Sequence, residues 1–217
     1  MVIWLTEEEL GRCREFSLRC AEQQQQIEFG QSDTAPRGVA EIGRDNLIGK
    51  IAEVAFAKML RERYGLAVEL DFNYYPRGVW DDQDTVINGW QIDVKGTRQG
   101  GRWMLIEWSK LRFRQKEGKL SHLYVMASVL WDRDRDVPTG GVDLVGAASF
   151  QRLRPGREGT VVLRKHDCIP GTRTHLQADN YGIRFDDLEG DWDKLLHYIR
   201  NHRPPDTGHF VGPIEQK

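Results

Sequence analysis

The sequence predicts an α/β domain with a mixed central β-sheet flanked by helices. Two long helical stretches precede residue 65, and β-prone runs then follow one another from residue 67 to residue 148. The dipeptide Asn88-Gly89 joins two of these runs and is the preferred sequence of a two-residue type I′ hairpin turn. A chain of 217 residues is also long enough to bury one sizeable core.

Local signals along the chain give the individual elements. Thr6, with Glu9 three residues later, forms a capping box at the start of the first helix. An Asx residue, Asp45 or Asn46, is expected to cap the second helix, and Gly65 is expected to end it. We expect helices at residues 6–29, 45–64 and 192–201, a loop at residues 30–43, and strands at residues 67–72, 84–87, 90–97, 103–108, 122–131, 142–148 and 160–163.

Composition and charge exclude several classes of protein. The formal net charge of -2 argues against a protein that coats nucleic acid through bulk positive charge. No apolar run approaches the roughly 20 residues that span a bilayer, and the acidic N-terminus lacks the basic start of a secretory signal. We therefore expect a cytoplasmic protein with no membrane partner.

The second strand of the predicted hairpin separates polar from apolar side chains. Successive residues of an extended strand face opposite sides, so Asp93 and Lys95 share one face while Ile92 and Val94 share the other. The Asn-Gly turn folds Asp84 back beside the polar face when the two strands pair in the expected register. Two carboxylates and one amine are therefore expected to converge.

Asp84, Asp93 and Lys95 together suit the hydrolysis of a phosphodiester. This reaction needs a nucleophilic water, neutralisation of charge in the transition state, and help for the leaving oxygen. Mg²⁺ supplies all three and prefers oxygen ligands, so Asp84 and Asp93 are the expected metal ligands. Lys95 is expected to orient the attacking water, stabilise negative charge or act as a base. A solvated ion pair on an amphipathic strand is the alternative interpretation of Asp93 and Lys95 taken alone.

Glu53 is the expected third carboxylate of the site. It lies on the second predicted helix among small and apolar residues such as Gly49 and Ala57, where a carboxylate is seldom only a solubilising charge. The small residues are expected to let the helix lie close to the sheet and bring Glu53 toward Asp84. An exposed glutamate near Lys50 is the alternative.

These pieces resemble the PD-(D/E)XK nuclease superfamily, also called restriction-endonuclease-like. Its members share a helix glutamate, a strand aspartate and a downstream (D/E)-x-K. The matching runs are Gly49-Lys50-Ile51-Ala52-Glu53, Asp84-Thr85-Val86-Ile87-Asn88-Gly89 and Gln91-Ile92-Asp93-Val94-Lys95. The resemblance covers roughly residues 45–150, because the later β-prone runs look like the closing strands of the same core.

The resemblance implies a fold, a cofactor and a kind of product. The fold would be a restriction-endonuclease-like core with a mixed central sheet, at residues 44–150. An N-terminal helix and loop at residues 1–43 and a C-terminal extension at residues 151–217 would surround it. The enzyme would depend on Mg²⁺, which Mn²⁺ can replace, would use Glu53, Asp84 and Asp93 as metal ligands with Lys95 as a further catalytic residue, and would leave 5′-phosphate ends. No proline precedes Asp84, and Asp81 or Asp82 could take its place at the metal.

A basic segment near the predicted site is the candidate nucleic-acid contact. Basic residues with an interleaved aromatic are typical of a flank that binds phosphates, and an ordinary solvated face is the alternative. The candidate binding residues are Arg98, Arg102, Lys110, Arg112, Arg114 and Lys116. We expect double-stranded DNA as the partner, with a homodimer as one form of assembly.

Two other functions stay open at this stage. A noncatalytic nucleic-acid-binding module of the same fold would bind without cutting, and a nuclease acting on RNA or branched DNA would keep the chemistry. A zinc site made from Cys168, His166 and His175 lacks a second close Cys or His pair. We therefore predict no structural metal. The expected function is that of a DNA endonuclease.

Overall fold

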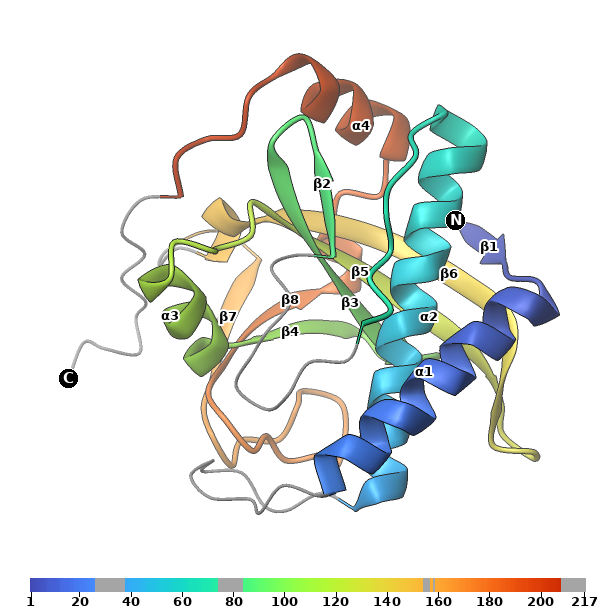
Figure 1. Cartoon of the computed structure of the whole chain (residues 1–217). Coiled ribbons are helices and arrows are strands. Elements are labelled where there is room, and N and C mark those ends of the chain that lie inside the picture. The colour runs from blue at the N-terminus through green and yellow to red at the C-terminus, as the bar shows by residue number, and fades with distance from the viewer. Residues whose placement is uncertain (26–37, 74–83, 154–156, 158, 208–217) are drawn as a thin grey trace.

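The computed structural model describes residues 1–25, 38–73, 84–153, 157 and 159–207. In this part of the chain the fold is mixed α/β, with a curled five-stranded sheet flanked by helices (Figure 1). The elements in chain order are β1 (Val2–Trp4), α1 (Glu7–Gln25), α2 (Val39–Tyr64), β2 (Thr85–Ile87), β3 (Trp90–Arg98), β4 (Trp103–Glu107), α3 (Trp108–Lys116), β5 (Leu123–Asp132), β6 (Val137–Ser149), η1 (Phe150–Leu153), β7 (Thr160–Leu163), β8 (Asn180–Arg184), η2 (Phe185–Asp187) and α4 (Trp192–Asn201).

The main sheet has the mixed character that the sequence predicts. Its strand order is β1-β6-β5-β3-β2, in which β3 and β5 are parallel and the other neighbours are antiparallel. The short edge strand β1 was not predicted, because three residues carry too little pattern to be recognised. Strand β6 begins at Val137, five residues before the start of the predicted strand at residues 142–148.

The two long helices confirm one predicted cap and correct another. The backbone N–H of Thr6 donates to Glu9, and the backbone N–H of Glu9 donates to the Thr6 hydroxyl at 3.2 Å, which is the predicted capping box. Helix α2 begins at Val39, directly after Gly38, so the predicted Asx cap at residues 45–46 is wrong. Apolar Ile42 is buried, and it extends the packed face of the helix toward its N-terminus.

The predicted hairpin is present with its predicted turn. Asn88 and Gly89 have φ values of 48° and 80°, the left-handed conformations that a type I′ turn requires at both positions. Opposite residues pair as Thr85 with Ile92 and Ile87 with Trp90. The hairpin therefore has the register on which the predicted position of Asp84 depends.

Helix α4 lies against the turn of this hairpin (Figure 1). The Asn88 side chain donates to the backbone carbonyl oxygens of Ile199, Arg200 and His202 at 3.0, 3.1 and 3.3 Å. The indole of Trp90 donates to the same His202 carbonyl at 2.8 Å. The end of α4 therefore holds the turn of the hairpin through several hydrogen bonds.

A second, smaller sheet has the strand order β4-β8-β7. Strand β4 is antiparallel to β8, which the sequence did not predict, while β7 was predicted at the same residues. The predicted strand at residues 67–72 is wrong: this segment follows α2 without joining a sheet. A β-prone run forms a strand only where another strand lies beside it. The sequence of the run does not show whether such a neighbour exists.

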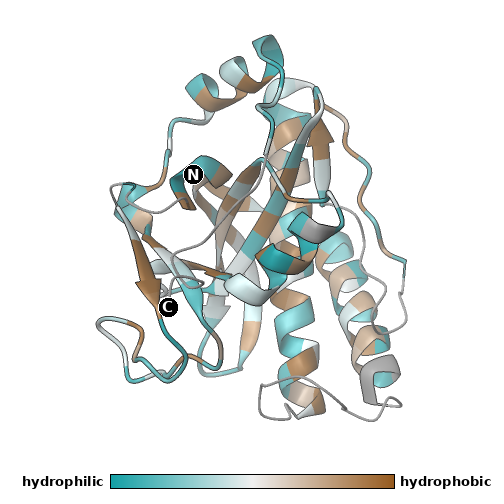
Figure 2. Ribbon diagram, turned by 90° about the vertical axis from the view of Figure 1, so that its left-hand side faces the viewer, coloured by the Kyte–Doolittle hydropathy of each residue, from teal (hydrophilic) through white to brown (hydrophobic). Residues whose placement is uncertain are grey.

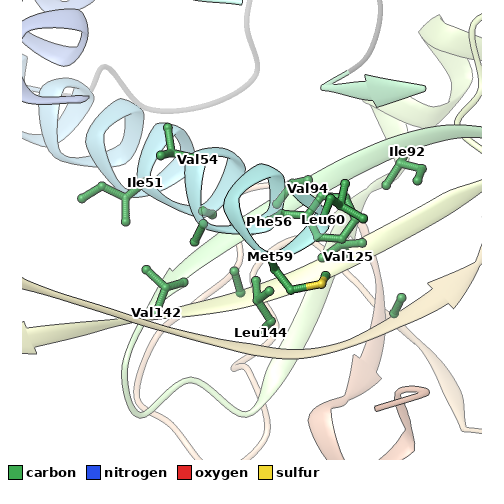
Figure 3. Packing of buried hydrophobic residues seen from close by; sticks show 14 of the residues in the cluster. Ile51, Val54, Phe56, Met59, Leu60, Ile92, Val94, Val125, Val142 and Leu144 are labelled. Atoms are coloured by element: carbon green, nitrogen blue, oxygen red, sulfur yellow. The ribbon is translucent and has the colours of Figure 1, made fainter. Parts of the chain in front are cut away.

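The two faces of β5 belong to two hydrophobic clusters, whereas β3 contributes residues only to the first of them. The first cluster joins α2 to the sheet and includes Phe56, Ile92, Val94 and Val125 (Figure 3). The second includes Tyr124 with residues of β4, α3 and β8. Hydrophilic and hydrophobic residues are mixed along the helices (Figure 2), and most of the residues from Ile48 to Leu60 of α2 are buried. Within the described residues, no helix combines the length and apolar character needed to cross a bilayer.

Candidate active site

The hairpin brings Asp84 back to β3 at the level of Asp93. Asp84 directly precedes β2, and its Oδ2 accepts a hydrogen bond of 2.6 Å from the backbone N–H of Val94. Continuing the antiparallel register from Thr85 and Ile92 places Asp84 opposite Asp93. The predicted convergence of these two carboxylates is therefore present.

Asp93 and Lys95 form an ion pair on one face of β3. The Nζ atom of Lys95 lies 2.7 Å from each of the Asp93 oxygens Oδ1 and Oδ2. Asp93 is only 7% exposed, while the Lys95 side chain is 34% exposed. A buried carboxylate beside a half-exposed amine differs from the solvated surface pair that was the alternative interpretation. The amine can reach solvent and substrate, and the carboxylate is held in place.

The two aspartates have opposite pKa shifts. Burial, followed by the charges of Asp93 and Glu53, raises the pKa of Asp84 well above its ordinary value. Burial also acts to raise the pKa of Asp93, but the Lys95 amine and a hydrogen bond from Asp84 outweigh it and the net shift is downward. Like charges at close range in a poorly solvated site produce this division between two carboxyl groups. Asp84 and Asp93 together therefore favour the binding of one proton. A cation bound between them would offset the repulsion of their two negative charges.

Glu53 lies on α2, and its charge contributes to the raised pKa of Asp84. Its side chain is 15% exposed and forms an ion pair with Lys50, which is buried. The predicted close approach of α2 to the sheet is present, but Gly96 of β3 permits it: a Cβ there would lie 2.8 Å from the carbonyl oxygen of Ile48. A Cβ on Gly49, one of the small residues to which the prediction assigned this approach, would have no atom within 4 Å.

The donor set fits a hard divalent cation in part. Asp84 and Asp93 offer carboxylate oxygens, and their mutual repulsion favours a cation between them. Among the residues that the structure describes, no three His, Cys, Asp or Glu side chains are close enough together to hold one ion, so Glu53 does not join the two aspartates as a third ligand here. Mg²⁺ needs only one or two protein carboxylates, because water and substrate phosphate complete its shell. The competing Asp81 and Asp82 lie outside the described residues.

The predicted nucleic-acid contacts separate into distinct environments. Arg98 forms an ion pair with Asp136 at 3.1 Å, and its guanidinium lies 4.4 Å from the centre of the Trp131 ring. Lys110 lies 3.4 Å from Glu107. Arg102 and Arg112 are exposed, and most of the basic segment forms the helix α3, which ends at Lys116.

Arg114 of α3 differs from the other basic residues because its charge affects the pKa of Asp93. It is half-buried, and its charge helps to lower the pKa of Asp93. Arg114 is thus placed where its charge acts on a carboxylate of the site.

Two residues near the site were not predicted. Tyr124 is the register partner of Asp93 on the parallel strand β5 and is 1% exposed, and burial raises the pKa of its hydroxyl. The pairing of two parallel strands leaves no local signal that could have identified it. Lys50 was named only as a neighbour of Glu53; its spacing of three residues from Glu53 on one helix was the available signal.

The residues of the rejected zinc site lie on an exposed segment. The Sγ atom of Cys168 is 3.4 Å from Nε2 of His175, and the Nδ1 atom of His175 is 3.0 Å from the carbonyl oxygen of His166. Cys168 is exposed and forms no disulfide. Cys168 and His175 bring together two side-chain donors, whereas a structural zinc site has four ligands.

No family model matches the chain, and no curated protein or solved structure is significantly similar to it. The resemblance to the PD-(D/E)XK superfamily therefore depends on the matching runs in the sequence. What the structure adds is a mixed α/β fold and the local geometry around Asp84, Asp93 and Lys95.

Proposed function

We propose that this protein is a metal-dependent nuclease with a restriction-endonuclease-like core, which cuts DNA and leaves 5′-phosphate ends. The observation that carries the proposal is the pairing of two carboxylates that repel each other, the partly buried Asp84 and the buried Asp93, with the half-exposed amine of Lys95. A protein that only bound nucleic acid would have no use for two such carboxylates, since they repel a phosphate. A hydrolase that needs a cation at this point does have a use for them.

Each residue of this group has a role that its environment supports. Asp84 and Asp93 would hold Mg²⁺ or Mn²⁺, which when bound supplies positive charge for the phosphate and lowers the pKa of water. Asp93 holds the Lys95 amine by its ion pair and so fixes where that amine points. Lys95 would then orient the attacking water or stabilise the negative charge that develops on the phosphate. Glu53 adds negative charge near Asp84.

DNA is the proposed substrate because basic residues flank the site while the chain as a whole is slightly acidic. Arg114 is near enough to influence Asp93, and the exposed Arg112 lies on the same short helix. Phosphate contacts of this kind position a strand without reading its sequence. The expected complex is therefore one in which a backbone phosphate of the strand reaches Lys95 from the side of α3.

The test is a cleavage assay on purified protein. The protein is incubated in Mg²⁺, Mn²⁺ or EDTA with plasmid, linear, single-stranded and branched DNA, and with RNA. The 5′ ends of the products are then labelled with a polynucleotide kinase, before and after phosphatase treatment. We expect cutting of DNA that EDTA abolishes, with ends that accept label only after phosphatase. Asp93→Asn and Lys95→Met should each lower the rate about 100- to 1000-fold, the usual loss for a group that stabilises the transition state.

Two variants serve as matched controls. Asp186→Asn and Lys194→Met change exposed residues of the same types, whose side chains are 85% and 70% exposed. Both should cut at the rate of the unaltered protein. Metal-dependent cutting that survives Asp93→Asn and Lys95→Met would show that the site is elsewhere. Binding of DNA without cutting under any of these conditions would favour the noncatalytic module instead.

A further inference from the structure

A groove of about 300 Å³ lies between α1, α2 and the segment that follows α2. This segment runs back along α2 (Figure 1). The apolar lining of the groove consists of Val54 and Ala57 of α2 and of Val68, Leu70 and Phe72 of the segment. Phe72 is held by an edge-to-face contact with Phe16 of α1, with ring centres 5.9 Å apart. None of the described lining residues belongs to the candidate active site, so the groove is a separate feature of the molecule.

One wall of the groove presents backbone groups that are not paired. The exposure of residues 67–70 alternates as in a strand: Ala67 and Glu69 are exposed, while Val68 and Leu70 are partly buried against the first hydrophobic cluster. Among the residues that the structure describes, none forms a backbone hydrogen bond with residues 67–70. A row of unpaired N–H and C=O groups is a template on which another strand can pair.

The rim of the groove carries more positive than negative charge. Its charged lining residues are Arg12, Lys58, Arg61 and Glu9. Lys58 lies 2.8 Å from Glu9, so these two charges offset each other. The Arg61 side chain is 60% exposed and lies 3.7 Å from Glu9 and 3.5 Å from Glu62.

Arg12 is the cation of the rim that is left for a ligand. It is exposed, and its guanidinium lies 4.5 Å from the centre of the Phe72 ring, directly beside the apolar lining. With the carboxylates of the described part of the chain it forms no ion pair. A carboxylate that enters the groove with an apolar group would therefore meet a guanidinium whose fork of donors suits it.

We propose that this groove binds an extended, acidic peptide of a partner protein. The peptide adds as a strand to residues 67–70, places an apolar side chain in the groove and brings a carboxylate to Arg12. In this mode of recognition the backbone hydrogen bonds supply affinity, and the side-chain pockets supply specificity. An alkyl carboxylate would fill the groove and pair with Arg12, but it would leave the backbone groups of residues 67–70 unpaired. The peptide is favoured because it uses all three features.

The experiment measures the binding of two fluorescein-labelled hexapeptides to the full chain by fluorescence anisotropy. In the first peptide glutamate alternates with leucine, and in the second lysine replaces each glutamate. Only the glutamate peptide should bind, since the lysine peptide has the same apolar side chains but is repelled by the rim. Arg12→Gln should weaken its binding about 10-fold, the usual loss of a charged hydrogen-bond partner. Ala57→Leu should weaken it at least about 10-fold, because the larger side chain occupies the groove.

Arg14→Gln is the matched control. Arg14 is also an arginine of α1 with a side chain 43% exposed, but it lies 3.6 Å from Glu7 and does not line the groove. This variant should bind the glutamate peptide like the unaltered protein. If Ala57→Leu does not fold by circular dichroism, Ala67→Leu on the opposite wall takes its place, with the same expected loss.

Amide hydrogen exchange, followed by NMR, tests the position of the added strand. In a strand pair the N–H groups point alternately toward and away from the partner strand. Saturation with the glutamate peptide should therefore slow the exchange of every second amide of residues 67–70. The amides that point away should exchange as before.

Each result either supports or overturns the peptide site. Binding of the glutamate peptide alone, weakened by Arg12→Gln and Ala57→Leu but not by Arg14→Gln, together with slower exchange at residues 67–70, would support it. It would be overturned by equal binding of both peptides, by binding of neither, by an equal loss in Arg14→Gln, or by binding without slower exchange. Binding of decanoate that depends on Arg12, in a protein that does not bind the glutamate peptide, would assign the groove to a small amphipathic acid instead.

Discussion

The two ends of the β2–β3 hairpin treat their polar groups in opposite ways. At the turn, Asn88 and Trp90 donate to backbone carbonyl oxygens at the end of α4, so each donor meets an acceptor. At the open end, Asp84 and Asp93 are two carboxyl groups in a poorly solvated place, and the pKa of Asp84 is raised as a result. Hydrogen bonds stabilise the turn, whereas at the open end two carboxyl groups repel each other.

This contrast indicates which end is built for stability and which for chemistry. Folded proteins normally pair buried charges of opposite sign, so a like-charged pair persists where a ligand is expected to compensate it. The hydrogen bonds at the turn also matter for the open end, because a hairpin that is fixed at its turn keeps its strand register and so keeps Asp84 opposite Asp93. Removing the donors at the turn should therefore cost stability, whereas removing one of the two repelling carboxyl groups at the open end should not.

The largest expected loss of stability comes from Gly96→Ala, at the contact that fixes the open end against α2. The new Cβ would lie 2.8 Å from the Ile48 carbonyl oxygen, a backbone atom that cannot move without the helix. We expect a loss of about 1–3 kcal/mol in the free energy of unfolding, the usual cost of overpacking, measured by urea denaturation. Gly49→Ala is the control: its Cβ meets nothing within 4 Å, and alanine in a helix should stabilise the protein by about 0.5–1 kcal/mol. Equal effects of the two changes would contradict the close contact.

A smaller loss is expected from changes at the turn. Asn88→Gly keeps a residue that tolerates the φ of 48° but removes the donors to α4, and should cost about 1 kcal/mol. Asn88→Asp keeps the shape of the side chain and presents a carboxylate to the same carbonyl oxygens, so it should cost more than the glycine. Both are measured by thermal and urea unfolding. An Asn88→Asp protein as stable as the unaltered one would show that α4 does not hold the turn.

The sequence allowed the local arrangement of Asp84, Asp93 and Lys95 to be predicted better than the pairing of distant strands, for a physical reason. Asp93 and Lys95 share a face because of the two-residue period of a strand, and Asp84 returns to them because an Asn-Gly turn has one preferred geometry. Both rules act over a few residues. The site could be predicted wherever its geometry is local.

Features that depend on distant partners were missed. Strand β8 exists as a partner of β4, far away in the sequence, and the run at residues 67–72 found no such partner. The burial of Lys50 depends on Phe16 and Phe72, which belong to two other segments of the chain. No window of neighbouring residues contains that information, so tertiary contacts decided these positions.

The smallest expected effect is a gain of stability at the open end. Asp84→Asn removes the carboxyl group whose ionisation is opposed in the folded state, and in the absence of metal it should stabilise the protein by about 0.5–2 kcal/mol, as the replacement of a strained functional residue often does. Because the pKa of Asp84 is raised on folding, the folded state holds the proton more tightly than the unfolded state. The unaltered protein therefore loses stability as the pH rises above the ordinary carboxyl value of 3.8, and the loss is complete above the raised value. The advantage of Asp84→Asn should accordingly be absent in strong acid and grow with pH, in urea titrations performed with EDTA, while Asp186→Asn shows no such trend. An advantage that does not change with pH, or a loss of stability, would mean that the two carboxyl groups do not repel each other, and the contrast between the ends of the hairpin would disappear.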